Sequence, residues 1–125
     1  MAWSGRTAVV AAYGEIDLTN ADELRDALFA VLDAGARGLV VDLTATTFLD
    51  SAGVTALART SRRASATDTS LRLAVTAPSV LRVLDLVGLD QLIGVFPSVS
   101  EAVASVDDLH LAALTEVRQL RHPFA

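Results

Sequence analysis

Phe48-Leu49-Asp50-Ser51-Ala52-Gly53 is the stretch that decides the fold, because a buried strand gives way to a helix within it. Upstream, residues 38–43 form a short apolar run rich in β-branched side chains, which is typical of a strand buried on both faces. Downstream, the apolar residues of 54–58 recur at i, i+3 and i+4, the spacing of a helix's inward stripe. We therefore expect a strand-to-helix junction with Ser51 as the N-cap residue of the helix.

Ser51 places a lone hydroxyl at this junction. As an N-cap, its oxygen would accept a hydrogen bond from one of the helix's unpaired amides. A phosphate on Ser51 would also meet backbone donors and the positive end of the helix dipole. Two interpretations are open at this point: a simple helix cap, and a site of modification.

Length and composition indicate one domain. The chain has 125 residues, 52% of them hydrophobic, enough for one core and too few for two. No apolar run approaches the roughly 20 residues that span a bilayer, and residues 1–6 lack the apolar core of a signal peptide. The absence of cysteine excludes disulfide, thiol-redox and cysteine-metal chemistry. We expect a soluble, cytoplasmic domain with no membrane contact.

Charge is acidic overall and unevenly spread. The net charge is −5 and all ten basic residues are arginine, which argues against direct nucleic-acid binding. Acidic and basic residues gather in separate clusters. Clusters of this kind are usually solvated faces, but they can also steer a protein partner. The acidic cluster comprises Glu15, Asp17, Asp22, Glu23 and Asp26, and the basic one Arg59, Arg62 and Arg63.

Strand and helix patterns alternate four times along the chain. The expected strands cover 7–13, 37–43, 71–75 and 92–96. The expected helices run from a cap at Thr19 or Asn20 to Gly35, over 52–64, from Pro78 to Gly88, and from a capping box at Ser98–Glu101 to about Val106, with a polar loop at 65–70. This alternation predicts helices packed on a sheet of largely parallel strands.

In open α/β sheets the working surface lies at the carboxyl ends of the strands. The turns that contain Asp17 and Asp50-Ser51 both follow predicted strands. We therefore expect these three residues on one edge of the molecule.

Catalysis finds no support in the sequence. The nucleophile elbow needs Gly-x-Ser-x-Gly, which residues 49–53 do not match, and the two histidines, His110 and His122, lie near the C-terminus. No spaced His/Asp/Glu ligand set suggests a metal, and a phosphate-binding Gly-Lys loop is ruled out because the chain has no lysine. We expect neither an enzyme nor a metal or other cofactor.

At this point the sequence resembles the STAS domain, which bacterial anti-sigma-factor antagonists share with the cytoplasmic tails of sulphate transporters. The resemblance covers about 7–106, in order and at the right spacing. The motifs that carry it are Gly14-Glu15-Ile16-Asp17, Leu24, Leu39–Leu43, Phe48–Gly53, Leu71-Arg72-Leu73, Pro78–Leu84 and Gly88-Leu89-Asp90.

The resemblance implies an α/β fold with a small mixed sheet of about four or five strands and helices mostly on one side. It also implies partner switching in bacterial transcription and the stress response. The unphosphorylated form would bind an anti-sigma factor with serine kinase activity and so free a sigma factor, phosphorylation would reverse this, and a serine phosphatase would complete the cycle. Ser51 maps onto the phosphate acceptor. The implied partner-binding residues are Asp17, Thr19, Asp50, Ala52 and Gly53.

The chain departs from the family pattern at two places. Ala52 stands where relatives usually carry a second Ser or Thr, and only residues 1–6 precede the first predicted strand. That strand would then present an open edge to a second copy of the chain, giving a homodimer. The domain is expected over 1–106 and a tail over 107–125. In the tail, the spacing of the apolar residues before Pro123 predicts a short helix that packs on the domain or on a second copy, and a frayed, disordered tail is the alternative. These apolar residues are Leu109, Ala112, Ala113, Val117 and Leu120.

An alternative function is a structural or sensory STAS subunit in a stressosome-like or transporter complex.

Overall fold

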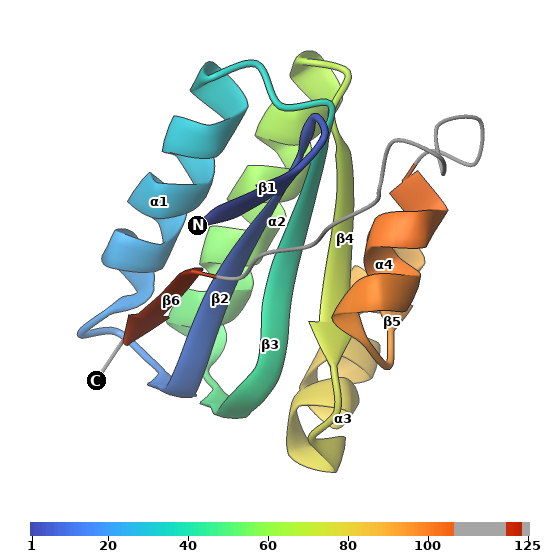
Figure 1. Ribbon diagram of the computed structural model, residues 1–125. Coiled ribbons are helices and arrows are strands. Elements are labelled where there is room, and N and C mark those ends of the chain that lie inside the picture. Colours follow the sequence, from blue (N-terminus) through green and yellow to red (C-terminus); the bar gives the residue numbers. More distant parts are fainter. Residues whose placement is uncertain (107–119, 124–125) are drawn as a thin grey trace.

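A mixed sheet forms the centre of the structure, a computed structural model that describes residues 1–106 and 120–123 (Figure 1). Among these residues the sheet has six strands in the order β1-β2-β3-β4-β5, with β6 also pairing with β2. Strands β2 to β5 and β6 pair in parallel, whereas β1 is antiparallel to β2. The strands are β1 (Ala2–Ser4), β2 (Thr7–Ile16), β3 (Gly38–Leu49), β4 (Ser70–Val75), β5 (Gly94–Phe96) and β6 (Leu120–Pro123).

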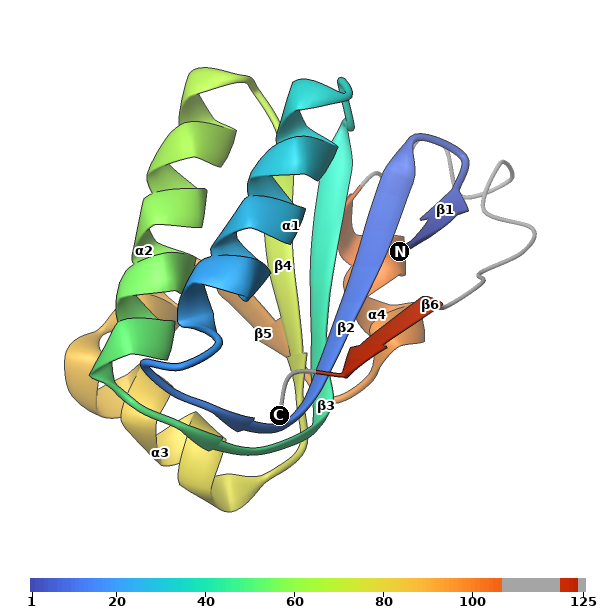
Figure 2. The same ribbon diagram turned by 90° about the vertical axis from the view of Figure 1, so that its left-hand side faces the viewer.

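Three helices cover one face of this sheet and a fourth covers the other. Figure 2 shows α1 and α2 on one side and α4 on the opposite side. Helix α3 packs into the same core as α1 and α2 through Val80 and Leu84. The helices are α1 (Ala21–Asp33), α2 (Ser51–Ala66), α3 (Pro78–Val87) and α4 (Val99–Val106), and a 3₁₀ turn, η1, spans Leu89–Gln91. The expected mixed sheet with helices mostly on one side is confirmed.

The alternation of side chains along each central strand explains this layering. In β3, Leu39 and Val41 face the core under α1 and α2, whereas Val40 faces α4. All three are fully buried. Successive side chains in a strand point to opposite faces, so an unbroken apolar run is what a doubly covered strand requires.

β2 and β3 are longer than expected and carry the site at their carboxyl ends. Their pairing runs from Thr7↔Gly38 to Ile16↔Leu49, with register shifts between Ala11 and Tyr13 and between Gly14 and Glu15. Gly14 has φ +82°, a left-handed conformation that glycine adopts without strain. Such irregularities in the pairing add twist and bend to the strands near the ends that carry the site.

Two expected boundaries differ from the structure. The polar segment 65–70 is shortened because α2 continues to Ala66 and β4 begins at Ser70. The strand expected over 92–96 starts only at Gly94, because η1 turns the chain and the Ile93 amide donates to the Leu89 carbonyl at 2.9 Å.

The prediction of an open edge on β2 is wrong. β1 pairs Ala2, Trp3 and Ser4 with residues 9, 8 and 7 of β2, so a short leading strand does precede it. β6 then pairs with Val10 to Tyr13. The two short strands together cover the edge that a second copy would have used.

The expected C-terminal helix is wrong at Leu120, which lies in strand β6. The rest of that expected helix, residues 109–117, lies outside the described residues.

Candidate functional site

The carboxyl ends of β2 and β3 bring the two acidic turns together. Ile16 and Leu49 are paired across the sheet, and the Asp50 amide donates to the Ile16 carbonyl at 3.1 Å. Asp17 and Asp50 are the next residues of the two strands. The structure therefore places Asp17, Asp50 and Ser51 on one edge of the sheet, as the alternating pattern predicts.

Asp50, and not Ser51, is the N-cap residue of α2. Its backbone is extended (φ −94°, ψ −173°), and its Oδ1 accepts hydrogen bonds from the amides of Ala52 (2.9 Å) and Gly53 (3.1 Å). The Val54 amide donates to the Asp50 carbonyl at 2.9 Å and starts the helical ladder. Sequence reasoning placed the cap one residue too late, because both Asp and Ser are good caps and spacing alone does not separate adjacent candidates.

Ser51 is the first residue of α2 and is exposed. Its carbonyl accepts from the Thr55 hydroxyl at 2.9 Å, while its own hydroxyl has no hydrogen-bond partner among the described residues. The expectation that backbone donors would receive a phosphate on Ser51 needs correction, because the Asp50 carboxylate already occupies the Ala52 and Gly53 amides. A phosphate there would point into solvent beside a second negative charge.

Gly53 lies where α2 comes closest to the strand ends. A Cβ at this position would clash with Leu49 Cδ1 and lie 3.0 Å from Ile16 Cγ2. The glycine of the motif therefore lets the first turn of α2 pack against the ends of both β2 and β3. This close approach fixes the place of Ser51 relative to Asp17.

Asp17 organises the turn that leads from β2 to α1. Its Oδ1 accepts from the Thr19 hydroxyl (2.5 Å) and the Thr19 amide (2.9 Å), and these two hydrogen bonds lower the pKa of the Asp17 carboxyl below its ordinary value. Asn20 is the N-cap residue of α1 by position, but its side chain bonds to the Asp17 amide and the Glu15 carbonyl, both at 2.9 Å. The turn is thus pre-formed, and Asp17 is not the simply solvated carboxylate that the sequence suggests.

A groove between α1 and α2 starts beside Ser51 and was not foreseen from the sequence. Its volume is about 190 Å³. α1 and the turn before it contribute Leu18, Ala21, Asp22 and Arg25, and α2 contributes Ala52, Thr55, Ala56 and Arg59. In the sequence, the signal for this groove was Leu18, an apolar residue inside an acidic turn. In the structure Leu18 is 82% exposed.

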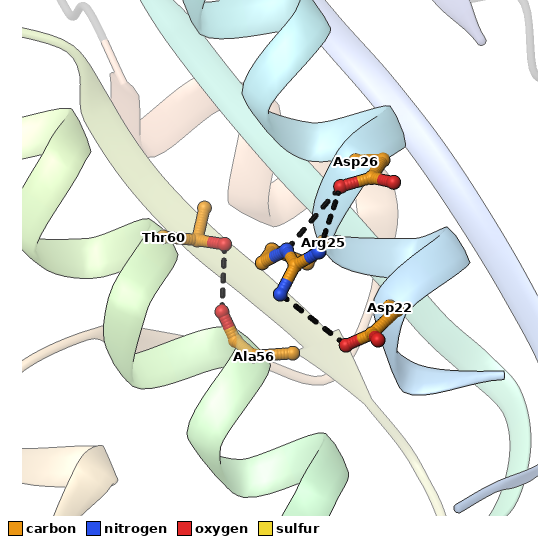
Figure 3. Close-up of polar contacts among 5 residues, drawn as sticks. All are labelled: Asp22, Arg25, Asp26, Ala56 and Thr60. Carbon is orange, nitrogen blue, oxygen red and sulfur yellow. Dashed lines mark hydrogen bonds and ion pairs between the residues drawn. The ribbon is translucent and has the colours of Figure 1, made fainter. Parts of the chain in front are cut away.

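Arg25 lies between the two helices at this groove (Figure 3). Its guanidinium is 3.3 Å from Asp22 Oδ1 and 3.1 Å from Asp26 Oδ1. Two acids of α1 therefore more than offset its charge. Arg59 is exposed and has no ion-pair partner in the described part of the chain, so its charge is not balanced.

Within residues 1–106 and 120–123, no helix is both long enough and apolar enough to cross a membrane.

Comparison with known proteins places this arrangement in a family. The STAS domain profile matches residues 3–102. The anti-sigma-F factor antagonist RsfB of Mycobacterium tuberculosis is 35% identical over 101 residues, which cover 79% of this chain and 80% of that protein.

Solved structures agree with the sequence match. The crystal structure of an anti-sigma factor antagonist from Mycobacterium paratuberculosis is 30% identical, with a TM-score of 0.78 over 85% of this chain and 91% of that one. A Thermotoga maritima protein at 20% identity has a TM-score of 0.72 over 82% and 88% of the two chains, a likeness of fold alone. With the order of motifs, the sheet topology and these matches in agreement, the chain belongs to the STAS domain family.

Proposed function

We propose that this protein is an anti-sigma-factor antagonist that acts by partner switching in the bacterial cytoplasm. In this proposal it is a binding protein and a kinase substrate rather than an enzyme. Its unphosphorylated form binds an anti-sigma factor with serine kinase activity and frees a sigma factor. Phosphorylation of Ser51 reverses the binding, and a serine phosphatase restores it. The names of the mycobacterial relatives support the anti-sigma part of this proposal.

The single observation that carries the switch is the exposed hydroxyl of Ser51, which makes no hydrogen bond within the described residues and directly follows Asp50, the N-cap residue of α2. A hydroxyl already used as the helix cap would have to break that bond before a kinase could use it. Here Asp50 holds the cap, so Ser51 can be modified with α2 intact. Phosphate adds about −1.5 to −2 charges. A partner surface shaped for a neutral serine would have to strip water from that charge, so binding weakens.

The Asp17 turn supports the proposal as a second partner contact. Its geometry is fixed by hydrogen bonds within the turn, which leaves Asp17 Oδ2 for a donor on another protein. Asp17→Asn retains an oxygen for the Thr19 hydrogen bonds, so the melting temperature should change little. Affinity for the anti-sigma factor should fall, because the negative charge is lost. A large fall in melting temperature with intact binding would instead make Asp17 a purely structural residue.

The experiment that tests the switch uses the full chain, the anti-sigma factor of its own bacterium that it captures in a pull-down, and ATP. Mass spectrometry should locate one phosphate on Ser51, and the phosphorylated chain should bind the anti-sigma factor more weakly than the unmodified one. Ser51→Ala should abolish phosphorylation. Ser65→Ala is the matched control, since Ser65 is an exposed serine on the same helix. Equal phosphate yield on Ser51→Ala would refute the assignment.

A further inference from the structure

The groove between α1 and α2 is continuous with the proposed switch. Ala52 is the residue after Ser51 and is also part of the groove lining. A partner that covers Ser51 therefore meets the groove within one helical turn. The inference below rests on the proposed function, since it takes the occupant from the same anti-sigma factor.

The groove lining is mostly apolar beside Ser51, with the Asp22–Arg25 pair on α1 and Arg59 farther along α2. Methyl groups of Ala21, Ala52 and Ala56 line it, and Leu18 stands at its margin with 82% of its surface exposed. Ala52 offers a methyl group directly after Ser51. An aliphatic side chain of a partner would bury apolar surface here at a gain of roughly 25 cal/mol per Å².

The cation farther along α2 is Arg59. Arg25 is held by Asp22 and Asp26, while Arg59 lacks an acidic partner among the residues described. An unbalanced guanidinium at the margin of a partly enclosed groove favours a carboxylate, which it can bind through two parallel hydrogen bonds. Charge complementarity therefore selects an acidic side chain over a basic one.

We propose that the α1–α2 groove binds a segment of the anti-sigma factor in which an aliphatic side chain packs on Leu18 and Ala52 and a carboxylate pairs with Arg59. The arrangement also gives phosphorylation a direct effect on binding. A phosphate on Ser51 lies on the same helix about 12 Å along the axis from Arg59, at 1.5 Å per residue. It would repel the incoming carboxylate over that distance, which is close to the screening length at physiological salt.

The test measures the affinity of variants of the full chain for the captured anti-sigma factor, with the proteins unphosphorylated. Arg59→Ala should weaken binding about tenfold and reduce its salt dependence. The matched control is Arg62→Ala, which removes the same charge from the same helix outside the groove lining and should change affinity less than about twofold.

A second pair of variants tests the apolar half. Leu18→Ala should weaken binding several-fold without lowering the melting temperature, because the side chain is exposed in the free protein. Leu92→Ala is its control, since Leu92 is 73% exposed and lies outside the groove.

The outcomes separate this inference from the proposed function. If Arg59→Ala and Leu18→Ala bind like wild type while phosphorylation at Ser51 still weakens binding, the groove is not the docking site and the switch stands. If the wild-type chain captures no anti-sigma factor, the proposed function fails and the groove assignment fails with it. Equal losses for Arg59→Ala and Arg62→Ala would show general charge steering and would also overturn the groove assignment.

Discussion

At the scale of single residues, Asp50 and Ser51 have different roles at the start of α2. The Asp50 carboxylate accepts from two backbone amides, and the Ser51 hydroxyl faces solvent. Because the cap and the modifiable hydroxyl are different residues, one can change without the other. This separation is what makes a covalent switch compatible with a stable helix.

Substituting the two residues should therefore have unequal effects on stability. Asp50→Ala leaves the Ala52 and Gly53 amides without their acceptor and should lower the free energy of unfolding by about 1 kcal/mol. Ser51→Ala should change it by less than about 0.5 kcal/mol, since the hydroxyl makes no bond. Urea unfolding followed by circular dichroism measures both. A larger loss of unfolding free energy for Ser51→Ala than for Asp50→Ala would show that Ser51 is the cap.

Asp17 offers a titration test of its turn. Its pKa lies below the ordinary value of 3.8, first because of the Thr19 hydroxyl and second because of the Thr19 amide. The contribution of a lowered carboxyl pKa to stability is present above the ordinary value and is lost as the pH falls through the folded-state pKa. Thr19→Ala removes the hydroxyl, so the Asp17 pKa should rise toward 3.8 in an NMR titration. An unchanged Asp17 pKa in that variant would show that the hydroxyl does not set it.

Helix α2, at the scale of elements, is fixed by one close approach and one ion pair. Gly53 packs its first turn against Leu49 and Ile16. Near its other end, Arg63 pairs with Asp33 at 2.7 Å and lies over the ring of Phe29, 4.6 Å from its centroid. The contacts of Gly53 hold the first turn of α2 against β2 and β3, and those of Arg63 hold its last turns against α1.

Gly53→Ala tests the close approach, because two effects of opposite sign compete. Helix propensity alone favours alanine by about 1 kcal/mol. The added Cβ would meet Leu49, and overpacking typically costs about 1–3 kcal/mol. We expect a net loss of stability and a lower melting temperature. Ser65→Ala, at an exposed position of the same helix, should leave the melting temperature unchanged or raise it slightly. A stabilised Gly53→Ala protein would contradict the tight packing.

At the scale of the whole molecule, two short strands cover the outer edge of β2. β1 protects residues 7–9 and β6 protects Val10 to Tyr13. A sheet edge left open exposes unpaired amides and carbonyls that another chain can use. The described fold therefore favours a monomer as long as β6 is in place.

Deleting residues 120–125 should expose this edge. We expect a lower melting temperature and a solution mass that rises with protein concentration, measured by light scattering after size exclusion. Removing only residues 124–125, which lie beyond β6, is the control and should alter neither quantity. If the longer deletion changes neither mass nor melting temperature, β6 does not protect the sheet.

The sequence alone determined the layered fold and the edge that carries the site. Apolar runs such as 38–43 and helical spacing such as 54–58 are local patterns, and each reports which faces of its own segment are buried. Because strands and helices alternate, the carboxyl-end turns with Asp17, Asp50 and Ser51 had to share one edge. The same motifs in order also sufficed to indicate the STAS family.

The tertiary structure alone decided which of two adjacent caps is used, how the β2 edge is covered, and where the groove lies. Leu49 pairs with Ile16 and is the last residue of β3. Asp50 is therefore the first residue after the strand, where it caps α2. The edge is covered by segments more than a hundred residues apart in sequence, Ala2–Ser4 and Leu120–Pro123. Leu18 and Arg59 line the same groove only because α1 and α2 pack side by side. Such contacts depend on the three-dimensional arrangement of distant segments, which local periodicity does not encode.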